Sequence, residues 1–192
     1  ALLSETREGE DIVAHSDDDL VYLQPDQLER AQRGGATIVY VTDGRADADR
    51  RHVGLMLAYT AGTGCGGWQC GWIDVLGHAV EHCRLEDAHL SLVFLGYPEG
   101  DPAGNDPTSI ARLWDGRLDI AISIGDLTTA YRRDDVLDTL TALVEATQHL
   151  LRSEFDASRQ APWRPVHDTS PMAYRFLIVV WPTASTLTPP HM

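Results

Sequence analysis

The residues with the clearest chemical potential are an imidazole and three carboxylates near the start of the chain. His15 is followed, after Ser16, by Asp17, Asp18 and Asp19. Three consecutive carboxylates repel one another unless a cation or a helix N-terminus offsets their charge. From a turn, His15 and Asp18 can both point at one zinc-like ion, which leaves Asp17 beside them to take a proton from a bound water. The alternative is an acidic cluster at the N-terminus of the following helix, and spacing alone leaves both open.

These residues need a framework of strands and helices to hold them. Apolar, β-branched runs predict strands at 11–14, 37–42, 90–95, 118–122 and 176–181. Patterns of good helix formers predict helices at 25–33, 47–61 and 131–151. Unalternated strands that alternate with helices are typical of parallel sheets covered on both faces. We therefore expect one domain over 1–192 with a doubly wound, Rossmann-like three-layer α/β fold, a mostly parallel sheet, and long loops (62–77 and 99–107) at its carboxyl edge.

The charge balance excludes several classes of partner. The chain carries 15 basic and 29 acidic residues, a net charge of −14, and every basic residue is Arg. A surface this negative repels phosphate backbones and anionic lipids, so we expect no nucleic-acid or membrane-surface binding. The absence of Lys excludes Schiff-base, P-loop and Ser-Lys mechanisms. We find no apolar run long enough for a membrane span and no signal peptide, and we expect a cytoplasmic location, although a chain already cleaved on export would look the same.

The cysteines and the central histidines give weaker signals. Cys65 and Cys70 are close enough in a Gly-rich segment to pair, and free thiols are the alternative for them and for Cys83. Their spacing does not predict a zinc site. His78 and His82 are four residues apart, but without the Glu of an H-E-x-x-H motif they indicate only a polar helix face.

A family resemblance adds to this interpretation. The run A-H-S-D-D-D at 14–19 resembles the A-H-P-D-D-E/D motif that opens the PIG-L/LmbE-like family of zinc-dependent N-deacetylases, with Ser16 in the Pro position. Segments further along the chain also resemble the family in the same order, at 23–26, 39–44, 91–100, 112–114 and 131–144. The likeness covers most of the chain to about residue 150.

The resemblance implies a metal centre and a base. It makes His15 and Asp18 ligands of Zn²⁺ (another divalent transition metal is possible) and Asp17 the general base. The family takes its third ligand from a late H-x-D-H motif, which does not occur in this chain. The nearest candidate for the third ligand is His167, and His149 is second. A loop carrying the motif and missing from the chain is the other explanation.

The resemblance also points to residues that contact the substrate. Arg51 stands where the family has an Arg-Glu pair near the substrate, with His52 in place of the Glu; a solvated helix Arg is the alternative. Trp68 and Trp72 lie in the predicted Gly-rich loop, where an indole can stack on a sugar or an aromatic aglycone, or else pack in the core. We expect Arg51 and Trp68 to bind substrate.

The implied activity is hydrolysis of an N-acetyl or N-acyl group from a glucosaminyl unit of a small-molecule glycoconjugate, plausibly a glycopeptide antibiotic intermediate. A GlcNAc-inositol type substrate is an alternative within the family. From another class, a sugar-binding or regulatory domain with the same fold but impaired catalysis remains open, because the H-x-D-H motif is missing. A magnesium-binding receiver domain is weaker, since it needs a late Lys. The oligomeric state stays open.

Overall fold

The computed structural model describes residues 9–33, 35–43, 47–100, 106–125 and 127–158, the last twelve of these by backbone alone. Its helices and strands follow one another in the order β1 (Gly9–Val13), α1 (Asp18–Tyr22), α2 (Asp26–Arg33), β2 (Ala36–Asp43), α3 (Ala48–Thr63), β3 (Trp68–Val75), β4 (His78–Leu85), η2 (Glu86–Ala88), β5 (Leu90–Pro98), α4 (Ile110–Trp114), β6 (Ala121–Ile122), β7 (Ala130–Tyr131) and α5 (Arg133–Ser158). The expected strand at 176–181 lies outside the described residues.

The main sheet is mixed. Its five strands run in the order β1-β2-β5-β4-β3. The β1–β2 and β2–β5 pairs are parallel, whereas β5–β4 and β4–β3 are antiparallel. An α/β architecture is therefore confirmed, but a mostly parallel sheet is not. Only the half of the sheet that contains β1, β2 and β5 has the parallel geometry expected from the sequence.

The antiparallel half arises from a hairpin that the sequence pattern did not reveal. The segment 62–77, expected to be a long loop, contains β3, and the predicted helix face of His78 and His82 belongs to β4. Leu76 and Gly77 connect the two strands with positive φ angles of 55° and 86°. A two-residue turn of this kind matches strand twist and makes the strands antiparallel. Because most of β3 is exposed, it lacks the apolar run by which the parallel strands were recognised.

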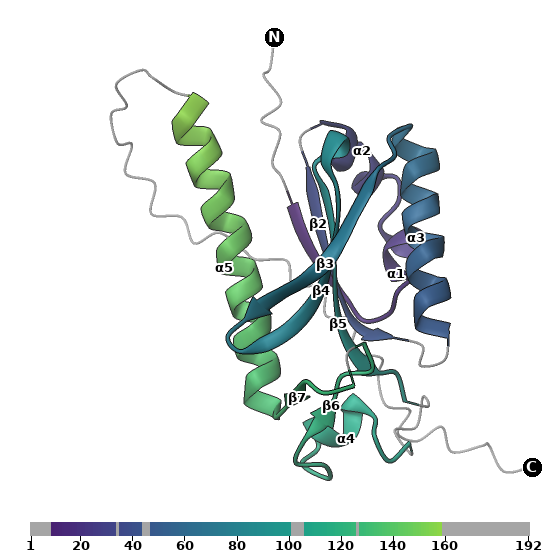
Figure 1. Ribbon diagram of the computed structural model, residues 1–192, viewed down its shortest axis with the longest axis vertical. Coiled ribbons are helices and arrows are strands. Elements are labelled where there is room, and N and C mark those ends of the chain that lie inside the picture. The colour runs from purple at the N-terminus through teal and green to yellow at the C-terminus, as the bar shows by residue number, and fades with distance from the viewer. Residues whose placement is uncertain (1–8, 34, 44–46, 101–105, 126, 159–192) are drawn as a thin grey trace, which may run out of the picture.

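Helices cover both faces of the sheet. In Figure 1 the sheet is seen between α1, α2 and α3 on one face and α5 on the other, with α4 and the small β6–β7 sheet at one end. Because the three parallel strands run in the same direction, the loops after β1, β2 and β5 lie at one edge of the sheet. We call this the carboxyl edge, and it is where ligands bind in open α/β sheets.

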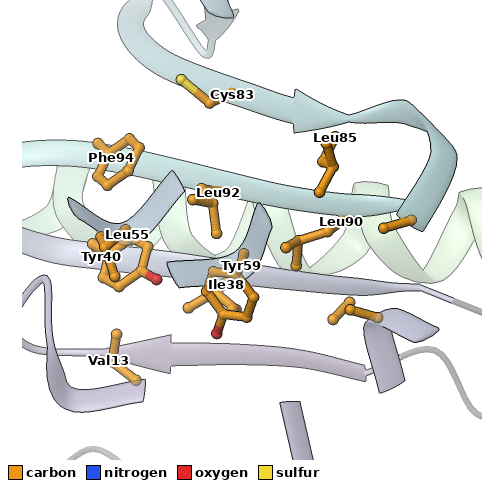
Figure 2. Packing of buried hydrophobic residues seen from close by; sticks show 13 residues of the cluster. Val13, Ile38, Tyr40, Leu55, Tyr59, Cys83, Leu85, Leu90, Leu92 and Phe94 are labelled. Atoms are coloured by element: carbon orange, nitrogen blue, oxygen red, sulfur yellow. The ribbon is translucent and has the colours of Figure 1, made fainter. Parts of the chain in front are cut away.

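The larger core lies under α3. Leu55 and Tyr59 of α3 pack against Ile38, Leu92 and Phe94 of the sheet, as Figure 2 shows, and all five side chains are at most 2% exposed. Replacing a Leu in such a place by Ala costs about 2–5 kcal/mol. This packing fixes α3 on the sheet and so determines where the side chains of its first turns lie.

A second core lies on the opposite face. It joins apolar side chains of the sheet, such as Val93 and Leu95, to Tyr131 of β7 and to Val136 and Leu143 of α5. The long helix predicted over 131–151 is thus confirmed, although it runs from Arg133 to Ser158. The predicted strand at 118–122 is reduced to β6, which pairs with β7 apart from the main sheet.

The hairpin also decides how the cysteines pair. Cys70 of β3 and Cys83 of β4 are directly opposite in the register and form a disulfide, while Cys65 is free. The suggested Cys65–Cys70 bond is therefore wrong. The reason is the same hairpin, which brings residues 13 positions apart face to face.

Candidate functional site

The expected histidine and aspartates lie at the carboxyl edge of β1. The strand ends at Val13, and the loop after it is attached to β2, because the Ala14 carbonyl accepts hydrogen bonds from both the backbone N–H (2.8 Å) and the hydroxyl (2.7 Å) of Thr42. The side chain of His15 is 40% exposed and that of Asp18 is 16% exposed. This loop is therefore fixed at its base and open to solvent at its functional side chains.

His15 and Asp18 are brought together as the spacing predicts. The backbone N–H of His15 donates to Asp18 Oδ2 at 2.9 Å, and His15 Nδ1 lies 3.3 Å from the same oxygen. An imidazole and a carboxylate that meet in this way form a donor pair that suits zinc and similar divalent ions.

Asp17 occupies the N-cap position of α1, but its side chain makes no capping hydrogen bond and is exposed. Asp18 and Asp19 lie in the first turn of α1, so the alternative of an acidic cluster at the helix N-terminus stays open beside the metal-site interpretation. The Asp17 carboxylate stays available to solvent, one residue before Asp18.

Asp19 lies in a different environment from its two neighbours. Its side chain is fully buried, and Asp19 Oδ2 accepts a hydrogen bond from the Tyr59 hydroxyl at 2.5 Å. Burial raises the pKa of the Asp19 carboxyl, and the hydrogen bond from Tyr59 partly opposes that rise. The crowding of three carboxylates is thus relieved in part by the fold, which turns one of them into the core toward α3.

Glu99, which was not predicted, connects the predicted residue Arg51 to the site. Glu99 follows β5, and its Oε1 lies 3.7 Å from His15 Nε2 while its Oε2 lies 3.3 Å from an Arg51 guanidinium nitrogen. Arg51 is 37% exposed at its side chain and belongs to α3. The structure therefore joins Arg51 to the His15–Asp18 pair through Glu99, a residue to which the sequence analysis gave no role. Its position directly after an apolar parallel strand was the signal that could have identified it.

A bulge in β5 brings Glu99 to this position. Tyr40 and Thr42 are two positions apart on β2, whereas their partners on β5, Phe94 and Tyr97, are three positions apart. Gly96 lies in this bulge with φ of +68°, and a Cβ there would come within 2.7 Å of the Ser123 hydroxyl. Bulges near the end of a strand redirect the side chains that follow.

His52 is the second residue near this edge to which the sequence pattern gave no role. It is 8% exposed, its Nε2 lies 2.9 Å from Asp43 Oδ1, and its Nδ1 lies 3.3 Å from Glu81 Oε2. Burial lowers the pKa of His52, but hydrogen bonds to Asp43 and Glu81 and their charges outweigh that effect and raise the pKa to about 9. The ring stacks on Phe94 with 3.6 Å between ring centroids.

Trp68 lies away from this site. It is opposite Leu85 in the sheet, in register with Leu90 and Ala36, which begin β5 and β2. Its indole N–H donates to the Met56 carbonyl (3.2 Å) and the Thr60 hydroxyl (3.0 Å) of α3. The register places Trp68 at the opposite edge from His15, so it packs beneath α3 and does not line the candidate site.

Trp72, the other tryptophan of this segment, is in a different environment. It is opposite Glu81, in the row of the sheet that includes Phe94, and it is 52% exposed. A Cβ at Gly125 would approach its ring to 3.1 Å, so the indole lies against the chain near β6. Trp72 is thus an exposed indole on β3, in the row of the sheet that includes Phe94.

The metal-binding prediction stays a prediction for the residues that the structure describes. Within those residues, no group of three or more His, Cys, Asp or Glu side chains is arranged to hold a metal ion. His15 and Asp18 supply two adjacent donors, and His167 lies outside the described residues, as does the side chain of His149. A zinc site with three protein ligands would therefore need a donor from the remaining part of the chain.

His78 and His82 make contacts with other residues of the two sheets. His78 stacks on Tyr131 with 4.3 Å between ring centroids, and His82 Nε2 lies 3.2 Å from the Ser91 hydroxyl. Burial, with a smaller contribution from Arg84, lowers the pKa of His82. Both side chains belong to the sheet and not to the candidate site.

Comparison with known proteins leaves the chain unplaced: no protein-family model, no curated protein and no solved structure matches it. In the described part of the chain, no helix is long and apolar enough to cross a membrane.

Proposed function

We propose that the protein is a zinc-dependent hydrolase that removes an N-acetyl or N-acyl group from a glucosaminyl unit of a small-molecule glycoconjugate. The observation that carries the proposal is the convergence of His15 and Asp18 on one point, with the exposed carboxylate of Asp17 beside them. It agrees with the resemblance of residues 14–19 to the opening motif of the PIG-L/LmbE-like deacetylases.

The site residues divide the chemistry among them. His15 and Asp18 would hold the ion, together with His167 as the proposed third ligand. A zinc ion held there supplies a Lewis acid and lowers the pKa of its water toward neutrality. Asp17 takes the proton of the attacking water at a carboxylate oxygen as the water adds to the amide carbonyl carbon. It then returns the proton to the leaving nitrogen as the C–N bond breaks, which yields an amine and a carboxylic acid.

Arg51 and Glu99 are suited to orient a substrate. Arg51 is held by Glu99 and is partly exposed beside His15, so its remaining N–H groups can donate to sugar hydroxyl or carbonyl oxygens. The exposed indole of Trp72 offers a flat apolar face on β3, as sugars and aromatic aglycones require. With a net charge of −14, the chain favours an amine-bearing substrate, such as a glycopeptide antibiotic intermediate, over a phosphate-bearing lipid.

The first test is the metal content of purified protein. We expect about one zinc per chain in the wild type and a loss of zinc in His15→Ala and in His167→Ala, with His82→Ala as a control that keeps the metal. Loss in His15→Ala alone would move the third ligand to another residue, with His149 next. No zinc in any variant after zinc is supplied would refute the metal-dependent mechanism.

The second test separates metal binding from proton transfer. Asp17→Asn keeps the shape of the side chain and removes its basicity, so it should retain zinc and lose turnover by about 10²–10⁴-fold. Turnover is followed as amine released from a glycopeptide pseudoaglycone and from a GlcNAc-inositol, which compares the two substrate classes. Unchanged turnover in Asp17→Asn would refute its role as the base.

A sugar-binding or regulatory domain with impaired catalysis is the second candidate. It is favoured by the finding that the described residues provide two metal donors and not three. For this candidate, calorimetry would detect binding of the same glycoconjugates with no release of amine. A protein that binds zinc and turns over either substrate would exclude it.

A further inference from the structure

His52 of α3 is a buried histidine with a carboxylate at each of its ring nitrogens. Its ring is buried and is bonded on both sides by carboxylates, Asp43 on β2 and Glu81 on β4. Asp43 is itself 2% exposed, whereas Glu81 is 28% exposed at its side chain. We call these three residues the His52 clamp.

The geometry of the His52 clamp requires a charged imidazole. A neutral imidazole has one N–H and can donate to one carboxylate only, whereas an imidazolium donates from both ring nitrogens. Two carboxylates at opposite nitrogens also mean that the three side chains do not converge on a shared ion. The stack on Phe94 of β5 fixes the plane of the ring. A single orientation of His52 is thus set by three neighbouring strands, β2, β4 and β5.

The His52 clamp is connected to the candidate site by two routes. One is along α3, because Arg51 precedes His52 and reaches Glu99, whose other oxygen faces His15 Nε2. The other runs through β2, because the carbonyl of Asp43 accepts a hydrogen bond from the backbone N–H of Glu99 at 3.2 Å. Both the side chain and the backbone of Glu99 therefore depend on partners that the His52 clamp holds in place.

We infer that His52 is a positioning residue: as an imidazolium between Asp43 and Glu81, it fixes the start of α3 and the end of β2 so that Arg51 and Glu99 lie correctly beside His15. The charged groups that face His52 are Asp43 of β2, Glu81 of β4 and, next to it on its own helix, Arg51. The inference deepens the proposed function, on which it depends only where turnover is measured. The structural part of the inference can be tested without measuring any enzymatic activity.

The first experiment measures the ring and its neighbours by NMR, on oxidised full-length protein with ¹⁵N-labelled histidine and backbone. At pH 7.5 we expect both ring nitrogens of His52 to carry protons, whereas His82 is neutral. In His52→Gln, the amide signals of Glu99 and His15 should shift, since both amides are hydrogen-bonded within the connected network. The matched control is His82→Gln, a half-buried histidine whose side chain lies on the other face of β4. It should leave these two amides in place.

Three results would overturn the inference. A neutral His52 ring at pH 7.5 removes its physical basis. Unmoved Glu99 and His15 amides in a folded His52→Gln show that the His52 clamp does not reach the site. If His52→Gln does not fold, Glu81→Gln removes one charge at a partly exposed position, and unmoved amides in that variant also overturn it.

The functional experiment tests the positioning role directly. We expect His52→Gln to retain zinc and to lower kcat by about 10–100-fold, the loss usual for residues that orient a ligand or base without touching substrate. A kcat equal to that of the wild type in a folded His52→Gln would overturn the positioning role. If neither the wild type nor the variants bind zinc or release amine, the proposed function fails. The NMR experiment then still tests whether the His52 clamp positions Glu99 and His15 at the carboxyl edge.

Discussion

The buried charge of His52 makes a quantitative prediction about stability and pH. The perturbation is His52→Gln, which removes the positive charge and keeps a side chain that can still donate one hydrogen bond. In the folded protein, burial lowers the pKa of His52, but the hydrogen bonds and charges of Asp43 and Glu81 raise it to about 9. In the unfolded chain the pKa returns to its ordinary value of about 6.5.

The magnitude follows from proton linkage. A pKa raised from 6.5 to about 9 corresponds to about 3 kcal/mol of unfolding free energy. Because the folded state binds the proton more tightly, this stabilisation is complete below about pH 6.5 and is lost as the pH rises through about 9. For a domain whose whole stability is of the order of 5–15 kcal/mol, the loss is large.

The assay is urea unfolding at several pH values from 6 to 9.5, with the disulfide kept oxidised. The informative quantity is the wild-type unfolding free energy minus that of His52→Gln, because other groups that titrate in this range do so in both proteins. We expect the difference to shrink by about 3 kcal/mol between pH 6 and 9.5. In the control His82→Gln the difference should not shrink as the pH rises, because burial lowers the pKa of His82 in the folded state and its own linkage can only increase the difference slightly between pH 6 and about 7.5. A difference for His52→Gln that does not change with pH would refute the charged His52 clamp.

Three further predictions concern the supports of the site. Tyr59→Phe leaves the buried Asp19 carboxylate without its hydroxyl partner and should lower the unfolding free energy by about 1–3 kcal/mol in urea titrations at pH 7, where an unchanged value would contradict the hydrogen bond. Thiol titration of the denatured, unreduced protein should find one thiol per chain, that of Cys65, and reduction should lower the unfolding free energy by about 3 kcal/mol; three thiols would mean that the chain is fully reduced, as a cytoplasmic location predicts. Trp72→Ala should weaken glycoconjugate binding in calorimetry with little loss of stability, whereas Trp68→Ala should cost about 2–3 kcal/mol of stability and spare binding, and the reverse pattern would contradict the placement of these two indoles.

The parallel half of the fold was predictable because its strands carry a strong local signal. Strands at β1, β2 and β5, and helices at α2, α3 and α5, are confirmed near their expected bounds. β2 and β5 are apolar runs that are largely buried, and each helix has good helix-forming residues between recognisable start and stop signals. Two helix ends lie beyond the predicted residues: α5 runs to Ser158, and α3 continues through Gly62 and stops at Gly64, whose φ of 73° gives the left-handed C-cap.

The β3–β4 hairpin was not predictable in the same way. Its residues are largely exposed on β3, and its glycines indicate a loop. The pairing of β4 with β5 provides the tertiary context that makes it a strand. The errors about the pairing of Cys70 and the helix expected at His78 and His82 follow from missing this hairpin, since register decides which residues face one another.

In the candidate site, too, the sequence predicted the residues that are close together in the chain but not the contacts between residues that are far apart in the chain. The sequence determined by itself that His15, Asp17 and Asp18 follow a buried strand, because residues this close in the chain are held near one another by a single turn. Only the tertiary structure decided that Glu99 and Arg51 join them, that Asp19 turns into the core to meet Tyr59, and that His52 lies between Asp43 and Glu81. Those contacts link residues far apart in the chain, and they depend on the order of the strands and the packing of α3, which no local pattern of residues encodes.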